Sequence, residues 1–207
     1  AGATMVDFGG WEMPIEYPGK IVAEHLYTRS ACSLFDVSHM GRILVDGTEA
    51  VPFLQHVLSS DAAAIAVDQA QYAIIPNERG GAVDDAYLYR FEEKRYLLVV
   101  NAANTDRDLA HLESQIGAFD ARITVITGDY AAIAVQGPKS DEILQVLTGG
   151  EAVTEPKRNA LRSLDFEGRS VHVAHTGYTG EPLSYEVYIR SEEAVWLWRR
   201  LIELGAK

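Results

Sequence analysis

Two adjacent aspartates, Asp84 and Asp85, have the type and spacing of residues that could do chemistry in this sequence. They follow the glycine pair Gly80-Gly81 and begin an apolar segment. Because side chains alternate along a β-strand, one carboxylate should face solvent while the other enters the core or a cavity. A buried carboxylate is costly unless a hydrogen-bond partner or a ligand compensates it. The pair could therefore supply an inward carboxylate to a binding site, and the simpler alternative is that it only closes the glycine turn.

A meander of three strands is expected to position this pair. Runs rich in Tyr, Ile, Val and Leu cover 71–77, 82–89 and 96–104, with short polar or glycine-containing turns between them. Helical patterns and caps predict helices on both sides of the meander, and Thr48 is the expected N-cap of the helix that precedes it. The predicted helices cover 19–31, 49–58, 107–116, 140–147 and 192–204.

The remaining segments complete an α+β pattern. A hairpin is expected over 158–174, and residues 5–18, which mix large apolar side chains with Gly and Pro, predict an irregular segment laid over a core. Hairpin-linked strands among helices favour antiparallel sheets in two sheet-and-helix layers. The other predicted strands cover 42–45, 121–127, 130–135 and 185–189.

Composition excludes several classes of protein. The formal net charge of −12 over 207 residues disfavours binding to nucleic acid. A single cysteine, Cys32, can form neither an internal disulfide nor a paired-cysteine metal site, and it fits a reducing, cytoplasmic setting. No apolar run approaches the roughly 20 residues of a membrane span, so no membrane association is expected.

Common catalytic patterns are missing from the sequence. The six histidines have no paired ligand spacing, so no metal site is expected. Ser38 and His39 are neighbours that would face opposite ways on a strand, which argues against a nucleophile and base. Neither a phosphate-binding loop nor a dinucleotide fingerprint occurs.

Six motifs together resemble a known family, the aminomethyltransferases, or T-proteins, of the glycine cleavage system. They occur in the order seen in that family and cover essentially the whole chain. The motifs are Met5-Val6-Asp7-Phe8-Gly9-Gly10-Trp11-Glu12-Met13-Pro14, Leu34-Phe35-Asp36-Val37-Ser38-His39-Met40-Gly41, Gly80-Gly81-Ala82-Val83-Asp84-Asp85, Val99-Val100-Asn101-Ala102-Ala103-Asn104, Gln136-Gly137-Pro138 and Thr176-Gly177-Tyr178-Thr179-Gly180-Glu181.

This resemblance implies a tetrahydrofolate-dependent enzyme. Family members accept the aminomethyl group carried on the lipoyl arm of the H-protein, release ammonia and form 5,10-methylenetetrahydrofolate. The family fold is a three-domain cloverleaf around a central folate cavity, and this chain would lack its C-terminal barrel domain. Residues 1–48 with 129–207 would form a first folate-binding subdomain, and 49–128 a second, ferredoxin-like one.

The resemblance also implies roles for seven side chains. Asp85 takes the place of the key carboxylate near the reacting folate nitrogens, and Asp84 is then structural. An ionised Asp85 could orient those nitrogens and stabilise developing positive charge. The implied cofactor-binding residues are Tyr72 and Asn101 lining the pterin pocket, Met40, Val99 and Tyr178 packing around the cofactor, and Glu186 accepting hydrogen bonds from the pterin.

Three alternatives stay open within or near this fold. One is a folate-dependent demethylase, or the folate domain of a sarcosine or dimethylglycine oxidoreductase. Another is the related folate-binding protein that assists iron–sulfur assembly, whose Lys-Gly-Cys-Tyr-x-Gly-Gln-Glu motif does not occur here. The third is a folate-binding module without catalytic activity.

Overall fold

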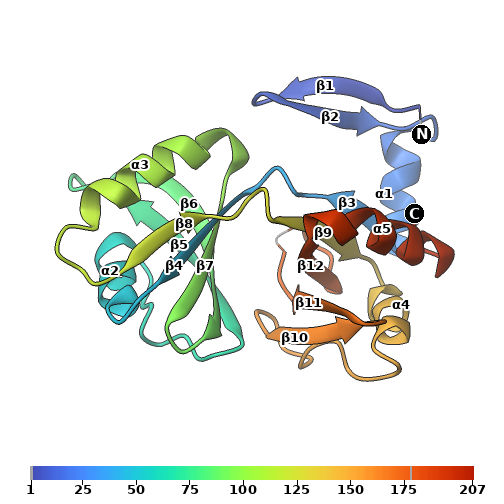
Figure 1. The fold of residues 1–207 in the computed structure, drawn as a ribbon. Coiled ribbons are helices and arrows are strands. Elements are labelled where there is room, and N and C mark those ends of the chain that lie inside the picture. Colours follow the sequence, from blue (N-terminus) through green and yellow to red (C-terminus); the bar gives the residue numbers. More distant parts are fainter. Residues whose placement is uncertain (1, 178) are drawn as a thin grey trace.

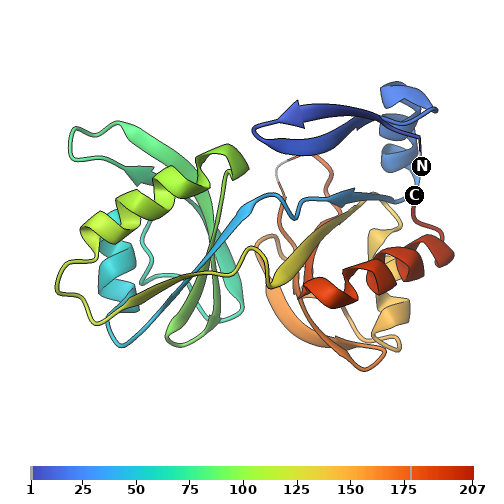
Figure 2. The ribbon, with the colours of Figure 1, turned by 45° about the horizontal axis from the view of Figure 1, so that its top comes forward.

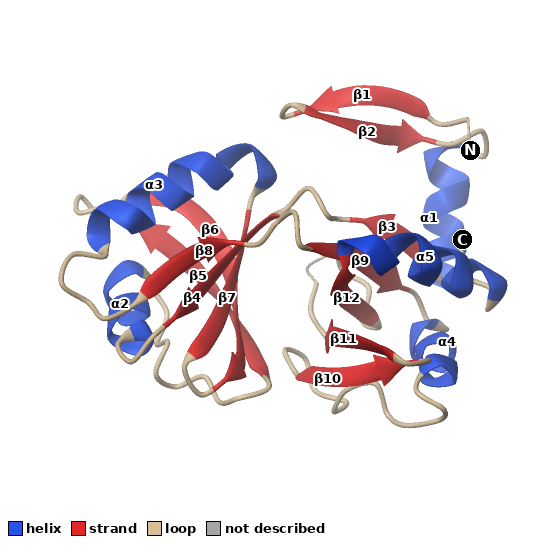
Figure 3. Ribbon diagram, in the orientation of Figure 1, coloured by secondary structure: helices blue, strands red, loops and turns tan. Residues whose placement is uncertain are grey.

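The computed structural model describes residues 2–177 and 179–207, which form two halves, each built on a five-stranded antiparallel sheet (Figure 1). Helices cover the sheets (Figure 3). The α+β class, the antiparallel sheets and the two sheet-and-helix layers predicted from sequence are confirmed. No helix in the described ranges is long and apolar enough to cross a membrane.

One half is built on the predicted meander, which is confirmed. Its strand order is β5-β6-β7-β4-β8, and helices α2 and α3 pack against one face through a core that includes Phe53, Leu88 and Leu112. Its elements are β4 (Gly41–Asp46), α2 (Ala50–Val57), β5 (Gln69–Pro76), β6 (Ala82–Glu92), β7 (Arg95–Val100), the 3-10 helix η1 (Ala102–Asn104), α3 (Thr105–Gln115) and β8 (Arg122–Val125).

The other half combines the start of the chain with its last third. Its strand order is β10-β11-β12-β9-β3, and helices α4 and α5 pack on the sheet through residues such as Leu144 and Leu197. Its elements are α1 (Lys20–Ser30), β3 (Ser33–Asp36), β9 (Tyr130–Gln136), α4 (Ser140–Leu147), β10 (Leu161–Phe166), β11 (Arg169–Ala174), β12 (Ser184–Arg190), the 3-10 helix η2 (Ser191–Glu193) and α5 (Ala194–Glu203).

The prediction of an irregular segment over 5–18 is wrong, because strands β1 (Thr4–Phe8) and β2 (Trp11–Glu16) form a hairpin there (Figures 1 and 2). Gly9 and Gly10, with φ of 60° and 89°, supply the two positive φ values that a two-residue hairpin turn requires. The turn reaches η1, where a Cβ at Gly9 would lie 3.1 Å from the Cβ of Ala103.

The expected cap at Thr48 is also wrong. Helix α2 begins at Ala50 with Glu49 in the N-cap position and no side-chain cap bond. The Thr48 hydroxyl instead donates to the Asp120 carboxylate, on the segment leading into β8. The hydroxyl thus bonds to Asp120, which is distant in sequence, in place of a backbone N–H at the start of α2.

The two halves meet through a continuous apolar layer. Aromatic and aliphatic side chains of β6 and β7 pack there against side chains of the other sheet. The buried members of this layer are Ala70, Tyr87, Tyr89, Leu97, Val99, Ala132, Leu161, Ala174 and Tyr188.

The buried guanidinium of Arg42 joins the two connections that link the halves. Its side chain is 1% exposed. Nη1 donates to the carbonyl of Met40 at 2.9 Å, and Nη2 donates to those of Ser38 at 3.0 Å, Tyr130 at 2.9 Å and Thr127. Ser38 and Met40 belong to the outgoing connection, Thr127 belongs to the returning one, and Tyr130 begins β9 at its end. A single side chain therefore holds both crossings together.

Strand pairing moves one expected boundary. Because β4 pairs with β7 and β8, residues 41–46 belong to the sheet that contains the meander. We propose a division into residues 1–40 with 129–207 and residues 41–128, with the first boundary at 40 and not at 48.

Candidate functional site

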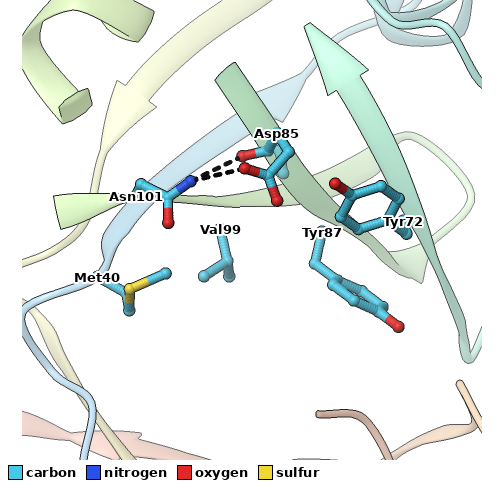
Figure 4. A pocket seen from close by; sticks show the side chains of 7 residues that line it. Met40, Tyr72, Asp85, Tyr87, Val99 and Asn101 are labelled. Atoms are coloured by element: carbon cyan, nitrogen blue, oxygen red, sulfur yellow. Dashed lines mark hydrogen bonds between the residues drawn. The ribbon is translucent and has the colours of Figure 1, made fainter. Parts of the chain in front are cut away.

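A pocket opens where β5, β6 and β7 present their side chains toward the other half (Figure 4). The sheet register brings Tyr72 opposite Tyr87 and Tyr87 opposite Val99, so these three form a row across three strands. The pocket is lined by Met40, Tyr72, Asp85, Ala86, Tyr87, Val99 and Asn101. Five of the seven side chains singled out from the sequence therefore meet in one place.

Asp84 and Asp85 separate as the alternation along a strand predicts. Asp85 is partly exposed and lines the pocket, whereas Asp84 is 8% exposed and lies beside the buried Asp108 carboxyl of α3. The simpler alternative, that both residues only close the turn, does not describe these contacts.

Asn101 bridges the two carboxylates from the end of β7. Its Nδ2 lies 2.9 Å from Asp84 Oδ1 and 3.0 Å from Asp85 Oδ1. Figure 4 shows the amide nitrogen turned toward Asp85 and the carbonyl oxygen turned the other way. Asn101 thus fixes the Asp85 carboxylate and keeps its own acceptor for another group.

Two tyrosines complete the wall. A hydrogen bond with Asp85, together with burial and the charges of Asp85 and Asp84, raises the pKa of Tyr72. Tyr87 is 7% exposed, and its hydroxyl donates to Asn159 Oδ1 at 3.1 Å. Sequence reasoning missed Tyr87, although its position two residues after Asp85 on the same strand would have placed it on the pocket face.

Asp84 forms a second carboxyl pair with Asp108 of α3, behind the pocket. Burial first, and then the hydrogen bond to and charge of Asp84, raise the pKa of Asp108 to about 7. For Asp84, burial acts upward, but the neighbouring Asp108 and Asn101 side chains, the Asp85 backbone and the Asn104 side chain outweigh it and lower its pKa. Asp84 is therefore the ionised member of the pair, and Asp108 is the member that holds a proton below neutral pH.

Glu186 lies on β12 of the facing sheet and does not line this pocket. Its Oε2 accepts hydrogen bonds from the hydroxyls of Tyr89 at 2.6 Å, Tyr188 at 3.2 Å and Thr176. Burial, and then the charge of Glu186, hold the pKa of both tyrosines well above the ordinary value. Among the described residues no donor is bonded to Oε1, so this oxygen can accept from another group. The seventh residue, Tyr178, lies outside the described residues.

A further cavity of about 130 Å³ lies between the sheets at the opposite end of β6 and β7. Phe91, Tyr130, His172 and Tyr188 form much of its wall, and Arg42 borders it. Burial lowers the pKa of His172. No set of three or more His, Cys, Asp or Glu side chains suited to a metal ion occurs in the described ranges.

The chemistry of the pocket is that of a site for a flat, polar heterocycle. Tyrosine, valine and methionine side chains offer faces that exclude water, while Asp85 and the Asn101 carbonyl offer acceptors at its edge. A carboxylate accepts charge-assisted hydrogen bonds from N–H groups. The residues present therefore fit a ligand with a planar ring and several N–H donors.

Comparisons with known proteins agree on one family. The family model described as the GCVT N-terminal domain matches residues 1–207. A protein of Deinococcus deserti named aminomethyltransferase is 44% identical over 205 residues, which are 99% of this chain and 57% of that protein. An aminomethyltransferase of Thermus thermophilus is 45% identical over 206 residues, covering 100% of this chain and 58% of that protein.

Solved structures extend the comparison to the fold. The glycine cleavage system aminomethyltransferase T from Bartonella henselae is 34% identical, with a TM-score of 0.89 over 100% of this chain and 55% of that one. A heterotetrameric sarcosine oxidase from Corynebacterium sp. U-96 is 15% identical over 90% of this chain and 93% of that one, with a TM-score of 0.60, so it shares the fold alone. The chain spans between 55% and 58% of the length of these three aminomethyltransferases.

Proposed function

Because the chain belongs to the family of the GCVT N-terminal domain, we propose that it is the folate-binding part of an aminomethyltransferase of glycine cleavage. The protein would accept the aminomethyl group from the lipoylated H-protein, release ammonia and form 5,10-methylenetetrahydrofolate. The observation that carries this proposal is the pocket in which Asn101 holds the Asp85 carboxylate beside Tyr72 and apolar walls. We place the reaction in the cytoplasm, where the one cysteine of this chain, Cys32, would remain a free, buried thiol.

Tetrahydrofolate matches the hydrogen-bond acceptors and the apolar faces of the site. Its pterin ring is flat and carries adjacent N–H groups, for which Oε1 of Glu186, which accepts from none of the described residues, is a suitable acceptor. Met40 and Val99 would cover the ring, and Tyr178 would pack beside it. The hydroxyls bonded to Oε2 hold the Glu186 carboxylate in one orientation.

Asp85 would act at the reacting nitrogens. Tetrahydrofolate supplies the nitrogens that receive the one-carbon unit. A carboxylate fixed beside them orients them and stabilises the positive charge that develops as the aminomethyl carbon is transferred. Since Asn101 already holds Asp85, this carboxylate needs little rearrangement when the substrates bind.

We expect Glu186→Gln in the full-length protein to weaken tetrahydrofolate binding about tenfold, because a charge-assisted hydrogen bond becomes a neutral one. Anaerobic titration calorimetry measures this change. Glu142→Gln, on an exposed position of α4, removes the same charge away from the pocket and should leave the dissociation constant unchanged. A Glu186→Gln protein that binds as tightly as wild type would remove Glu186 from the site.

A substrate comparison tests the reaction itself. The full-length protein should release ammonia from aminomethylated H-protein in the presence of tetrahydrofolate and should leave free sarcosine and dimethylglycine unchanged. Turnover of the free methylated amines would assign a demethylase to this fold. Folate binding without turnover of either substrate would assign a binding module.

A further inference from the structure

Asp108 of helix α3 lies next to Asp84 and is not one of the residues that line the pocket. Its side chain is fully buried, and neither of its carboxyl oxygens has an N–H or O–H donor among the described residues. Arg107 Nε lies 3.9 Å from Asp108 Oδ1, and the guanidinium of Arg107 donates instead to the carbonyl of Val83. A buried carboxyl group needs a partner, and the partner within hydrogen-bonding reach is the Asp84 carboxyl.

Two carboxyl groups can bond only when one of them carries a proton. Asp84 Oδ1 already accepts from Asn101, and no other donor in the described ranges reaches Asp84 Oδ2. The geometry therefore leaves Asp108 as the donor and Asp84 as the acceptor. The pair holds one proton and one negative charge between them, as close carboxyl pairs do.

From this arrangement, and resting on the function proposed above, we propose that Asp108 is a positioning residue of the reaction: its carboxyl proton fixes Asp84, Asp84 holds Asn101, and Asn101 orients Asp85. Each link of this chain is a hydrogen bond, and Asp85 is the member that meets the substrates. Removing the first link frees the Asn101 amide to leave its bridging position.

The hydrogen bond between Asp108 and Asp84 should be lost as pH rises. Asp108, with its pKa raised to about 7, loses its proton above neutrality and places a second negative charge beside Asp84. The charged groups that act on it are Asp84 and Asp85 from β6 and Arg107 from α3. Repulsion between the two carboxylates then breaks their hydrogen bond. Turnover should decline on the alkaline side with an apparent pKa near 7.

The protonation of Asp108 also makes the free energy of unfolding depend on pH. The carboxyl pKa of an unperturbed aspartate is 3.8, and that of folded Asp108 is about 7. The folded chain therefore holds more protons than the unfolded chain between these values, and the contribution of Asp108 to stability is full below pH 4 and lost as pH rises toward 7. Asp108→Asn should make the free energy of unfolding fall less steeply across this window.

The test compares two substitutions in the full-length protein. Asp108→Asn supplies an N–H donor at every pH, so we expect turnover within about threefold of wild type at pH 6.5 and no decline near pH 7. Asp108→Leu supplies none, so we expect turnover to fall about tenfold at every pH while the KM for tetrahydrofolate changes less. Asp106→Asn, exposed on the same helix, should keep the wild-type pH profile.

Two results would overturn the proposal. One is an Asp108→Asn enzyme that keeps the wild-type alkaline decline, and the other is a folded Asp108→Leu enzyme with undiminished turnover. A carboxyl-carbon NMR titration of the wild-type protein gives a readout that does not depend on the reaction. A carboxyl that titrates near pH 7 and disappears in Asp108→Asn supports the shared proton even if the proposed activity is absent, and its absence from the wild-type spectrum refutes it.

Discussion

Replacing Asp85 by asparagine should lower turnover about a hundredfold or more and change tetrahydrofolate affinity by less than about threefold. The substitution keeps the shape of the side chain and an oxygen for the Asn101 amide, which lies 3.0 Å from Asp85 Oδ1. It removes only the negative charge, which under the proposed mechanism acts on charge that develops during transfer. A group needed in the transition state and not for binding affects kcat far more than binding.

Steady-state kinetics together with equilibrium folate binding separate these two effects. Asp106→Asn is the matched control, because it removes the same charge from an exposed position on α3. An Asp85→Asn enzyme with wild-type kcat would show that the carboxylate has no catalytic role. A large loss of folate affinity with little change in kcat would make it a binding residue.

Arg42→Met should lower the free energy of unfolding by at least about 3 kcal/mol. The guanidinium donates to four backbone carbonyls, three on the two connections between the halves and one on the first residue of β9. Methionine fills similar volume but donates no hydrogen bond, so these acceptors lose their partner, and each unsatisfied buried group costs about 1–3 kcal/mol. No carboxylate in the described ranges lies within 4 Å of this guanidinium. The expected loss of stability therefore comes from its hydrogen bonds and not from an ion pair.

Chemical denaturation of the full-length protein measures this loss. Arg199→Met on α5 is the control, because Arg199 is exposed and methionine has nearly the same helix propensity. If the two variants unfold at the same denaturant concentration, Arg42 does not hold the crossings together. Since Asp85 and Glu186 lie on opposite halves, a weakened crossing should also lower folate affinity.

Patterns that depend on neighbouring residues could be predicted from the sequence. The meander of β5, β6 and β7 follows from alternating apolar residues between glycine-containing and polar turns. The same alternation separates Asp84 from Asp85. The positions of Tyr72 and Asn101 beside Asp85 came from the family resemblance, and the sheet register shows why they meet.

Features that depend on distant partners could not be predicted. Asp108 looks like an ordinary polar position near the start of an amphipathic helix until the fold places it under Asp84. Arg42 lies in an apolar strand pattern, but its partners Thr127 and Tyr130 are far along the chain. The contacts of Glu186 with Tyr89 likewise require two strands from different halves to face each other.

The β1–β2 hairpin illustrates a different difficulty. The glycines and the two prolines of 5–18 favour an irregular segment, yet Gly9-Gly10 is the turn of the hairpin. Pro14 remains compatible with β2 because this sheet has two strands and each is an edge, where a missing N–H costs little.

The most direct test of the central claim is the product balance of one reaction. Aminomethylated H-protein is incubated with the full-length protein, with and without tetrahydrofolate, and ammonia and 5,10-methylenetetrahydrofolate are measured together. The proposed function predicts equal amounts of both products, formed only with tetrahydrofolate and lost in the Asp85→Asn enzyme. Ammonia release that does not depend on tetrahydrofolate, or equal yields from the Asp85→Asn enzyme, would contradict it.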